Sequence, residues 1–262
     1  AYQGISEIGE DQNTEVENKD NSQFIDMSLA KDIEAYFQEN GIDHEKVAYC
    51  ITDLEHNIKY SMNEKDEFIA ASIYKLPLAM LYYDKVNEGE YTLDSTFTYS
   101  GYMHEDAGVI SSDYGIGSQV PLSDLLNDLI IYSDNDAGHI LYENLGGWKE
   151  YKEAMTKYTD SISENYYTMD NVTTANTMND VVTYLYDHKE DYKGLIKNME
   201  EAEPGEYLDR DTQLSMPQKY GMYDSALNSV GFVECNTSYS IVVLTSLGDK
   251  GADVMANINR IA

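Results

Sequence analysis

Strand-type segments lie near both ends of this 262-residue chain and enclose a long middle part with the apolar spacing of helices. Apolar and β-branched runs predict strands over about 47–53 and 57–61, and three more after residue 213. Strands separated in this way predict one antiparallel sheet built from both ends of the chain. The expected fold class is therefore α+β, with a five-stranded antiparallel sheet flanked by helices and an all-helical lobe.

The domain boundaries follow from the same pattern. Residues 1–27 are polar and acidic, which predicts a flexible acidic linker. Residues 28–262 are expected to form one domain, with a sheet lobe of about 28–89 and 213–262 around a helical lobe of about 90–212. The first C-terminal strand is expected to begin at Gln213–Met216.

The most informative motif is Ser72-Ile-Tyr-Lys75, at the start of an apolar helical pattern that runs to about Asn87. Ser72 would lie in the first turn, where free backbone N–H groups favour negative charge, and Lys75 would share its face. A serine nucleophile needs a nearby base, and a lysine can be that base when burial or positive neighbours lower its pKa. The alternative is an ordinary core helix with a capping serine and a lysine that reaches solvent.

A second motif, Ser133-Asp-Asn135, falls in a short link between two predicted helices, 122–132 and 136–145. Such a link can project Ser133 and Asn135 into a cleft while Asp134 bonds to backbone. Taken alone, the motif also fits a plain helix-capping turn.

The third motif, Lys219-Tyr-Gly221, belongs to the strand-rich C-terminus. A lysine on an edge strand beside a pocket would supply positive charge for a substrate carboxylate and would help to keep Lys75 neutral. Gly221 would let a substrate backbone approach closely. The alternative is an edge-strand lysine that prevents aggregation.

The order and spacing of the three motifs resemble those of the class A β-lactamase family and its relatives among the penicillin-recognising serine enzymes. The resemblance implies that Ser72 is the acylated nucleophile and that Lys75 is its base or proton relay. The other implied roles are a proton shuttle for Ser133, a hydrogen bond from Asn135 to the substrate amide, a carboxylate site at Lys219, and an oxyanion hole formed by the N–H groups of Ser72 and Met222.

Two positions depart from the family pattern. Tyr220 stands where the family has a smaller hydroxyl residue, so its direct contact with a substrate carboxylate is an open question. The family releases the acyl group with a loop glutamate followed four residues later by asparagine, whereas here Glu164 is followed by Thr168. Glu164 is the candidate for this deacylation base, and a solvated acidic loop is the alternative.

These features favour a serine hydrolase that opens β-lactams through an acyl-Ser72 intermediate. A D-alanyl-D-alanine peptidase or penicillin-binding protein, and a β-lactam or cell-wall sensor without turnover, are the alternatives. The expected partner is a small-molecule β-lactam or a peptidoglycan stem peptide, with no metal or other cofactor, and the chain is expected to be a monomer.

Composition narrows the setting in which such a protein would act. The net charge of −31 argues against nucleic-acid partners, which require basic surfaces. The function implied by the resemblance, and the acidic N-terminal segment, predict an extracytoplasmic protein, either secreted or anchored to the membrane through a segment upstream of Ala1.

Overall fold

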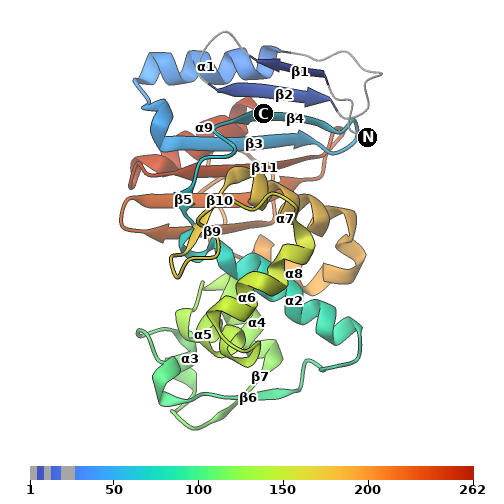
Figure 1. Ribbon diagram of the computed structural model, residues 1–262, viewed down its shortest axis with the longest axis vertical. Coiled ribbons are helices and arrows are strands. Elements are labelled where there is room, and N and C mark those ends of the chain that lie inside the picture. Colours follow the sequence, from blue (N-terminus) through green and yellow to red (C-terminus); the bar gives the residue numbers. More distant parts are fainter. Residues whose placement is uncertain (1–4, 9–12, 19–26) are drawn as a thin grey trace.

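The computed structural model describes residues 5–8, 13–18 and 27–262, and it confirms the α+β class (Figure 1). Over these residues the main sheet has seven antiparallel strands in the order β1-β2-β4-β3-β11-β10-β9. The strands are β1 (Ile5–Ile8), β2 (Thr14–Asn18), β3 (Val47–Asp53), β4 (Ile58–Met62), β9 (Gln218–Tyr223), β10 (Ala226–Val233) and β11 (Tyr239–Thr245).

The five strands expected from both chain ends form the centre and one edge of this sheet. Strand β3 pairs with β11, where Ile51 lies opposite Ile241, so the two halves of the chain meet in the middle. The predicted strand start at Gln213–Met216 is wrong, because β9 begins at Gln218 and contains the Lys219-Tyr-Gly221 motif itself. Pro217 directly precedes β9, and a proline has no N–H group for a strand ladder.

The other two strands come from the segment that the composition predicts to be a flexible linker. Strand β2 pairs with β4, where Val16 lies opposite Tyr60, and β1 pairs with β2. Val16 is fully buried, while Glu15 and Glu17 are partly exposed. Within this acidic segment, buried and partly exposed residues alternate in the way that is typical of a strand. Because β2 pairs with β4, β4 is not an unpaired edge strand.

Helices occupy most of the rest of the chain. The helices are α1 (Ser28–Asn40), α2 (Lys75–Asn87), α3 (Val109–Asp113), α4 (Leu122–Ile131), α5 (Asn135–Asn144), α6 (Trp148–Met155), α7 (Ala175–Asp187), α8 (Lys193–Glu200) and α9 (Lys250–Ile261), with short 3-10 turns at 44–46, 71–74, 101–103, 156–158 and 189–192. Two small ladders pair β5 (Phe68–Ile69) with β8 (Val172–Thr173) and β6 (Thr96–Thr98) with β7 (Gln119–Pro121). No helix in the described part of the chain has the length and apolarity needed to cross a membrane.

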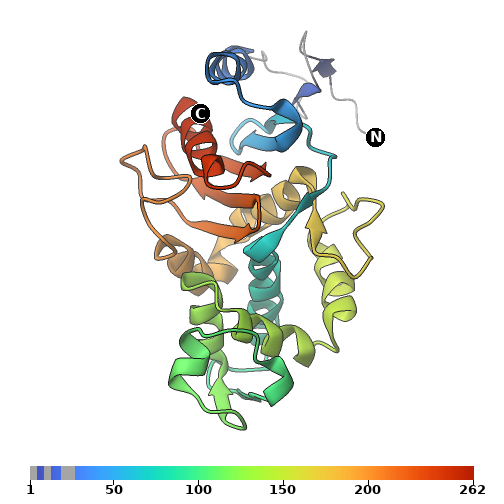
Figure 2. The ribbon, with the colours of Figure 1, turned by 90° about the vertical axis from the view of Figure 1, so that its left-hand side faces the viewer.

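Helices cover both faces of the sheet, with α9 and α7 on opposite sides (Figure 2). Successive residues of a strand point to opposite faces. Tyr49 and Ile241 accordingly pack in the core beneath α1 and α9, and Cys50 and Val242 pack in the core shared with α7 and the helical lobe. Burial on both faces explains why β3, β10 and β11 are nearly continuous apolar runs.

Helix α2 runs from the edge of the sheet into the helical lobe, and its first eight residues are all buried. The 3-10 turn Ala71–Tyr74 leads directly into it, so Ser72 lies at the junction of the two lobes. The predicted helix from about Ser72 to Asn87 is confirmed, with its first turn tightened to 3-10 geometry.

Asn228 of β10 fixes the chain just before this junction. Its fully buried side chain donates to the carbonyls of Ile69 (2.9 Å) and Ala70 (3.0 Å) and accepts a hydrogen bond from the N–H of Thr245 (3.0 Å). One side chain of the sheet therefore satisfies three backbone groups and ties the turn that carries Ser72 to the rigid strands.

Replacing Asn228 by alanine should lower the free energy of unfolding by about 2–4 kcal/mol, because it leaves buried backbone groups without partners. Urea denaturation would measure the change. Asn40→Ala is the matched control, since the Asn40 side chain is exposed and donates to the Tyr36 carbonyl within its own helix, α1. That variant should stay within about 0.5 kcal/mol of the parent. Equal losses of unfolding free energy in both variants would show that the hydrogen bonds of Asn228 do not stabilise the fold in this way.

Candidate active site

Ser72 is held in a strained turn between the two lobes. Ala71, directly before it, has a φ of +51°, in the left-handed region that residues with a Cβ rarely adopt. The Ala71 carbonyl accepts a hydrogen bond from Asn171 Nδ2 (2.8 Å), and Ala70 N donates to the Asn171 carbonyl (2.9 Å). With Asn228 on the other side, these bonds hold the strained conformation in place.

Lys75 lies one turn after Ser72 and is fully buried. Its Nζ lies 3.1 Å from Ser72 Oγ, 2.6 Å from Asn135 Oδ1, 2.6 Å from the Ser133 carbonyl and 3.2 Å from Ser133 Oγ. Burial lowers the pKa of Lys75 to about 8, although the negative charges of Asp134 and Glu105 oppose the shift. A substantial fraction of Lys75 is therefore neutral near pH 7–8 and able to accept a proton from Ser72.

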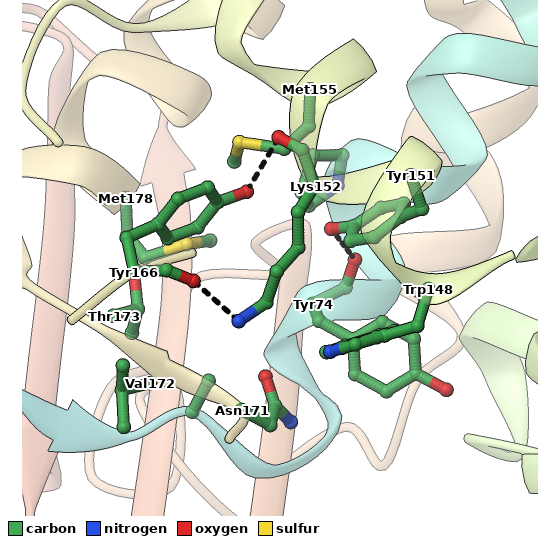
Figure 3. Close-up of a pocket in the computed structure, with 12 residues that line it drawn as sticks. Tyr74, Trp148, Tyr151, Lys152, Met155, Tyr166, Asn171, Val172, Thr173 and Met178 are labelled. Carbon is green, nitrogen blue, oxygen red and sulfur yellow. Dashed lines mark hydrogen bonds between the residues drawn. The ribbon is translucent and has the colours of Figure 1, made fainter. Parts of the chain in front are cut away.

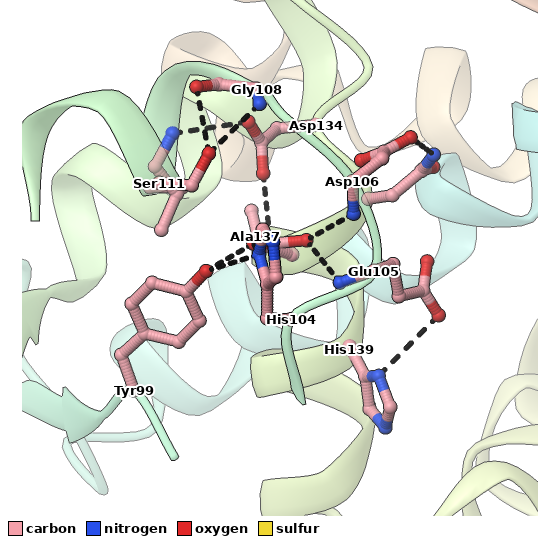
Figure 4. Close-up of polar contacts among 12 residues, drawn as sticks. Tyr99, His104, Glu105, Asp106, Gly108, Ser111, Asp134, Ala137 and His139 are labelled. Atoms are coloured by element: carbon pink, nitrogen blue, oxygen red, sulfur yellow. Dashed lines mark hydrogen bonds and ion pairs between the residues drawn. The ribbon is translucent and has the colours of Figure 1, made fainter. Parts of the chain in front are cut away.

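The Ser133-Asp-Asn135 link joins α4 to α5, as the sequence predicts. Ser133 has a φ of +53°, which turns its carbonyl and hydroxyl toward Lys75. The Asp134 carboxylate accepts from Ala137 N (2.9 Å) at the start of α5, and from Val109 N (2.7 Å) and Ile110 N (3.1 Å) at the start of α3 (Figure 4). Asp134 thus caps two helices at once and fixes the link between them.

Asn135 connects the buried lysine to the surface of the cleft. Its Oδ1 accepts from Lys75, and its Nδ2 donates to Asp106 Oδ2 (2.8 Å). The hydrogen bond to Lys75 sets the orientation of the amide, so that Nδ2 points away from the lysine and can serve a carbonyl of a bound molecule in place of Asp106.

Lys219 approaches the same serine hydroxyl from the sheet. Its Nζ is fully buried and lies 3.0 Å from Ser133 Oγ and 2.5 Å from the Tyr220 carbonyl. Burial, followed by the charge of Lys75, lowers the pKa of Lys219 well below its ordinary value. Ser133 Oγ is therefore within hydrogen-bond distance of both lysines and is the link between them.

Gly221 brings strand β9 against the Ser72 turn. A Cβ atom at Gly221 would lie 2.6 Å from Ser72 N and 2.8 Å from Ile73 N, distances that real Cβ atoms essentially never show. The glycine is therefore needed for contact within the chain itself, and the approach of a substrate backbone at Gly221 stays a prediction. This contact brings β9 against the Ser72 N–H, and Met222 follows Gly221 in the same strand.

Tyr220 lies apart from the cleft. Its ring stacks on Tyr207, with 4.7 Å between ring centroids and 16° between planes, and Lys219 Nζ lies 4.2 Å from the ring centre. Tyr220 is not among the residues that line the cleft, and burial raises the pKa of its hydroxyl to about 12. The Tyr220 ring therefore packs against Lys219 and Tyr207 and does not line the cleft.

An open cleft of about 810 Å³ lies over Ser72. Its described walls come from both lobes and from the loop before β8. They are formed by Ile69, Ala71, Ser72, Tyr74, Glu105, Asn135, Tyr142, Trp148, Met169, Asp170, Asn171, Val172, Met222 and Tyr223. Ser72 therefore lies at a space large enough for a small molecule, and the two lysine side chains lie beneath its surface.

The loop of residues 159–171 does not bring Glu164 to this cleft. Glu164 is exposed and is not one of the lining residues, whereas Asp170 and Asn171 of the same loop are. In this structure the sequence candidate for the deacylation base therefore lies outside the cleft that contains Ser72.

A buried lysine that the motif search missed holds this loop. Lys152 of α6 donates to the Tyr166 carbonyl (2.5 Å) beside a small cavity of about 20 Å³ (Figure 3). It also donates to the carbonyls of Thr168 (2.9 Å) and Asp170 (2.5 Å). Burial lowers the pKa of Lys152, while the charge of Asp170 opposes the shift. The signal was present in the sequence, because Lys152 shares the apolar helical stripe of Trp148, Tyr151 and Met155.

A second cluster that the sequence did not reveal fixes the loop of residues 104–106 (Figure 4). The buried Asp136 carboxylate accepts from the Tyr99 hydroxyl, from His104 Nδ1 (2.7 Å) and from Glu105 N (2.9 Å). Burial acts to raise the pKa of Asp136, but these hydrogen bonds outweigh it and hold the pKa below its usual range. They also hold Glu105 at the wall of the cleft.

No group of three or more His, Cys, Asp or Glu side chains among the described residues could hold a metal ion. The two cysteines lie apart as free thiols, Cys50 buried and Cys235 exposed. The groups that the site brings together are a serine hydroxyl, a partly neutral lysine and a second hydroxyl that bridges two lysines, a set suited to attack by a serine nucleophile.

Comparison with known proteins identifies the family and the fold. The family model described as the beta-lactamase enzyme family matches residues 28–262. No curated protein matches the chain in sequence. Many solved structures share the fold.

Three of these structures illustrate the range. A β-lactamase from Chitinophaga pinensis DSM 2588 is 21% identical, with a TM-score of 0.75 over 89% of this chain and 97% of its own. The TLA-3 extended-spectrum β-lactamase is 20% identical, with a TM-score of 0.76 over 89% and 96%. A single-residue mutant of PBP-A, solved as an acyl-enzyme complex with penicillin G, is 16% identical, with a TM-score of 0.76 over 90% and 94%.

Replacing Lys152 by methionine should loosen the loop before β8, because three carbonyls lose a charged donor worth about 1.5–3 kcal/mol per hydrogen bond. Amide hydrogen exchange across 159–171 should accelerate by roughly tenfold or more. Lys149→Met is the control, since Lys149 lies on the same helix with 74% of its side chain exposed. Unchanged exchange in the Lys152 variant would show that the loop is held by other contacts.

Proposed function

Because the chain belongs to the beta-lactamase enzyme family, we propose that it is a serine hydrolase that opens β-lactam rings through an acyl intermediate on Ser72 and releases the acyl group slowly. One observation carries the proposal. Lys75 Nζ lies within 3.2 Å of both Ser72 Oγ and Ser133 Oγ, so a nucleophile, its base and a path for the proton meet at one buried amine.

The acylation step follows from these contacts. Neutral Lys75 accepts the Ser72 proton while Oγ attacks the lactam carbonyl carbon and forms a tetrahedral oxyanion. The backbone N–H groups of Ser72 and of Met222, which follows Gly221 where β9 meets the Ser72 turn, would stabilise that oxygen. As the ring C–N bond breaks, the Lys75 proton passes through Ser133 to the leaving nitrogen and restores neutral Lys75.

Substrate binding would use the lysine on the sheet. Penicillins and D-alanyl-D-alanine peptides both carry a carboxylate, and the Lys219 amine, buried beside Ser133 Oγ, is the group that would meet it. Because burial and the charge of Lys75 lower the pKa of Lys219, an incoming carboxylate would favour its protonated form. Asn135 would donate its Nδ2 to the amide carbonyl on the acyl side.

The slow release follows from the position of Glu164. Hydrolysis of the acyl-Ser72 ester needs a base that positions a water molecule, and the loop carboxylate predicted for this role is exposed and outside the cleft. The same observation favours a second candidate, a penicillin-binding D-alanyl-D-alanine peptidase or sensor that β-lactams acylate without turnover. Either activity on extracellular substrates would require an extracytoplasmic location.

Intact-protein mass after addition of penicillin G is the decisive measurement. One added penicillin mass should appear on the protein, should be absent from Ser72→Ala, and should decay slowly with release of the opened product. Glu164→Gln should release the adduct at the parent rate. Faster decay of the adduct in the parent than in Glu164→Gln would show that Glu164 acts in the hydrolysis of the acyl-Ser72 ester. A permanent adduct would select the second candidate, and no adduct would overturn both.

The acylation rate should depend on pH through Lys75. Since only the neutral amine accepts the Ser72 proton and its pKa is about 8, the rate constant should rise about tenfold per pH unit below pH 7 and level off above pH 9. Lys75→Ala should lose roughly 10²–10⁴-fold in rate together with this titration. A profile in the parent that is flat from pH 6 to 9 would exclude Lys75 as the base.

A further inference from the structure

Three aromatic rings form one wall of the cleft beside Ser72. Trp148 makes edge-to-face contacts with Tyr74 and with Tyr142, at centroid distances of 5.1 and 5.3 Å. All three side chains line the cleft. Rings of this kind present electron-rich surfaces, which attract apolar groups and cations.

The charged side chains among the described lining residues are both acids, Glu105 and Asp170. Glu105 lies close to the aromatic wall, since burial and then its negative charge raise the pKa of Tyr142 to about 12. The Glu105 backbone is fixed by its hydrogen bond to buried Asp136, while its side chain remains 42% exposed. A carboxylate is thus held beside three aromatic rings on the side of the nucleophile where Asn135 lies.

From this arrangement, we propose that the wall formed by Glu105, Tyr74, Tyr142 and Trp148 is a subsite for a protonated amine on the acyl group of the substrate. The proposal rests on the proposed acylation of Ser72 and adds to it a substrate class. Those substrates carry a carboxylate for Lys219 on one side of the scissile amide and an ammonium group for Glu105 on the other.

The chemistry of the wall favours an ammonium group over other ligands. A carboxylate next to aromatic rings suits an organic cation, because charge attraction and cation–π attraction act together. An anionic acyl group would meet two carboxylates and no lining cation among the described residues. One carboxylate among aromatic rings also lacks the set of oxygen ligands that a divalent cation requires.

His139 is the group that competes for Glu105. Its Nδ1 lies 3.4 Å from Glu105 Oε1, and its ring stacks on Tyr142 at 4.8 Å. That Nδ1 atom is buried without a hydrogen-bond partner, and the contact with Glu105 is long. A primary ammonium group has three donors and can approach the carboxylate more closely than the imidazole does.

The rim of the cleft would accept an apolar part of the same acyl group. Met169, Tyr223 and Met222 line the cleft with 79%, 66% and 53% of their surface exposed. An acyl group that combines a ring or alkyl arm with an ammonium group would therefore bury apolar surface as well as pair its charge.

Ampicillin and penicillin G are the matched probes, because they differ by one ammonium group on the acyl side chain. Their second-order acylation rate constants would be measured by intact mass at pH 7. Glu105→Gln should lower the ratio of the ampicillin rate to the penicillin G rate by about three- to tenfold, the size expected of a partly exposed charge pair with cation–π support. Any effect of Glu105 on Lys75 acts on both rates and cancels in the ratio.

Glu153→Gln is the control, because Glu153 lies on α6 with 57% of its side chain exposed and is not a lining residue. It should leave the ratio unchanged, and added salt should reduce the ratio in the parent but not in Glu105→Gln. An equal ratio in the parent and in Glu105→Gln would overturn the subsite while the proposed function stands. Absence of acylation by either penicillin would overturn the proposed function itself.

Discussion

Two lysine side chains buried on either side of one serine hydroxyl are the constraint on which the rest of this site depends. Both amines lie within hydrogen-bond distance of Ser133 Oγ, and burial lowers the pKa of each. Two buried ammonium ions so close together would be costly. The free protein therefore favours states in which at most one of the two amines is protonated. In the proposed mechanism this arrangement would let Lys75 act as the base and would let an incoming anion favour the charged form of Lys219.

Maintaining such a pair requires rigid surroundings, and polar side chains of the helices and sheet supply them. Asn228 ties the Ser72 turn to β10, Asp134 caps α3 and α5 on either side of Ser133, and Lys152 collects three carbonyls of the loop before β8. In each case a single side chain forms hydrogen bonds with several backbone groups of a loop or turn. The left-handed backbone at Ala71 and Ser133 persists because these bonds over-determine it.

The sequence predicted what local patterns and motifs encode. The helix that follows Ser72, the two helices on either side of the Ser133 link and the central strands are present in the structure. It also brings together the motif residues Ser72, Lys75, Ser133, Asn135 and Lys219. Features that depend on tertiary contact were not predictable. The use of Gly221 depends on a turn in the first third of the chain, Tyr220 turns toward Tyr207, and β2 exists because β4 offers an edge.

The loop before β8 links the two unusual properties of this cleft. Because Lys152 draws the carbonyls of Tyr166, Thr168 and Asp170 toward α6, the loop presents backbone to its interior, and Glu164 remains at the surface. The same loop leaves Trp148 and Tyr142 as part of the open cleft wall. A loop held in this way keeps the expected base for acyl release outside the cleft and leaves the aromatic wall open to it. The proposed slow release and the proposed recognition of an amine-bearing acyl group would therefore both depend on the loop that Lys152 holds.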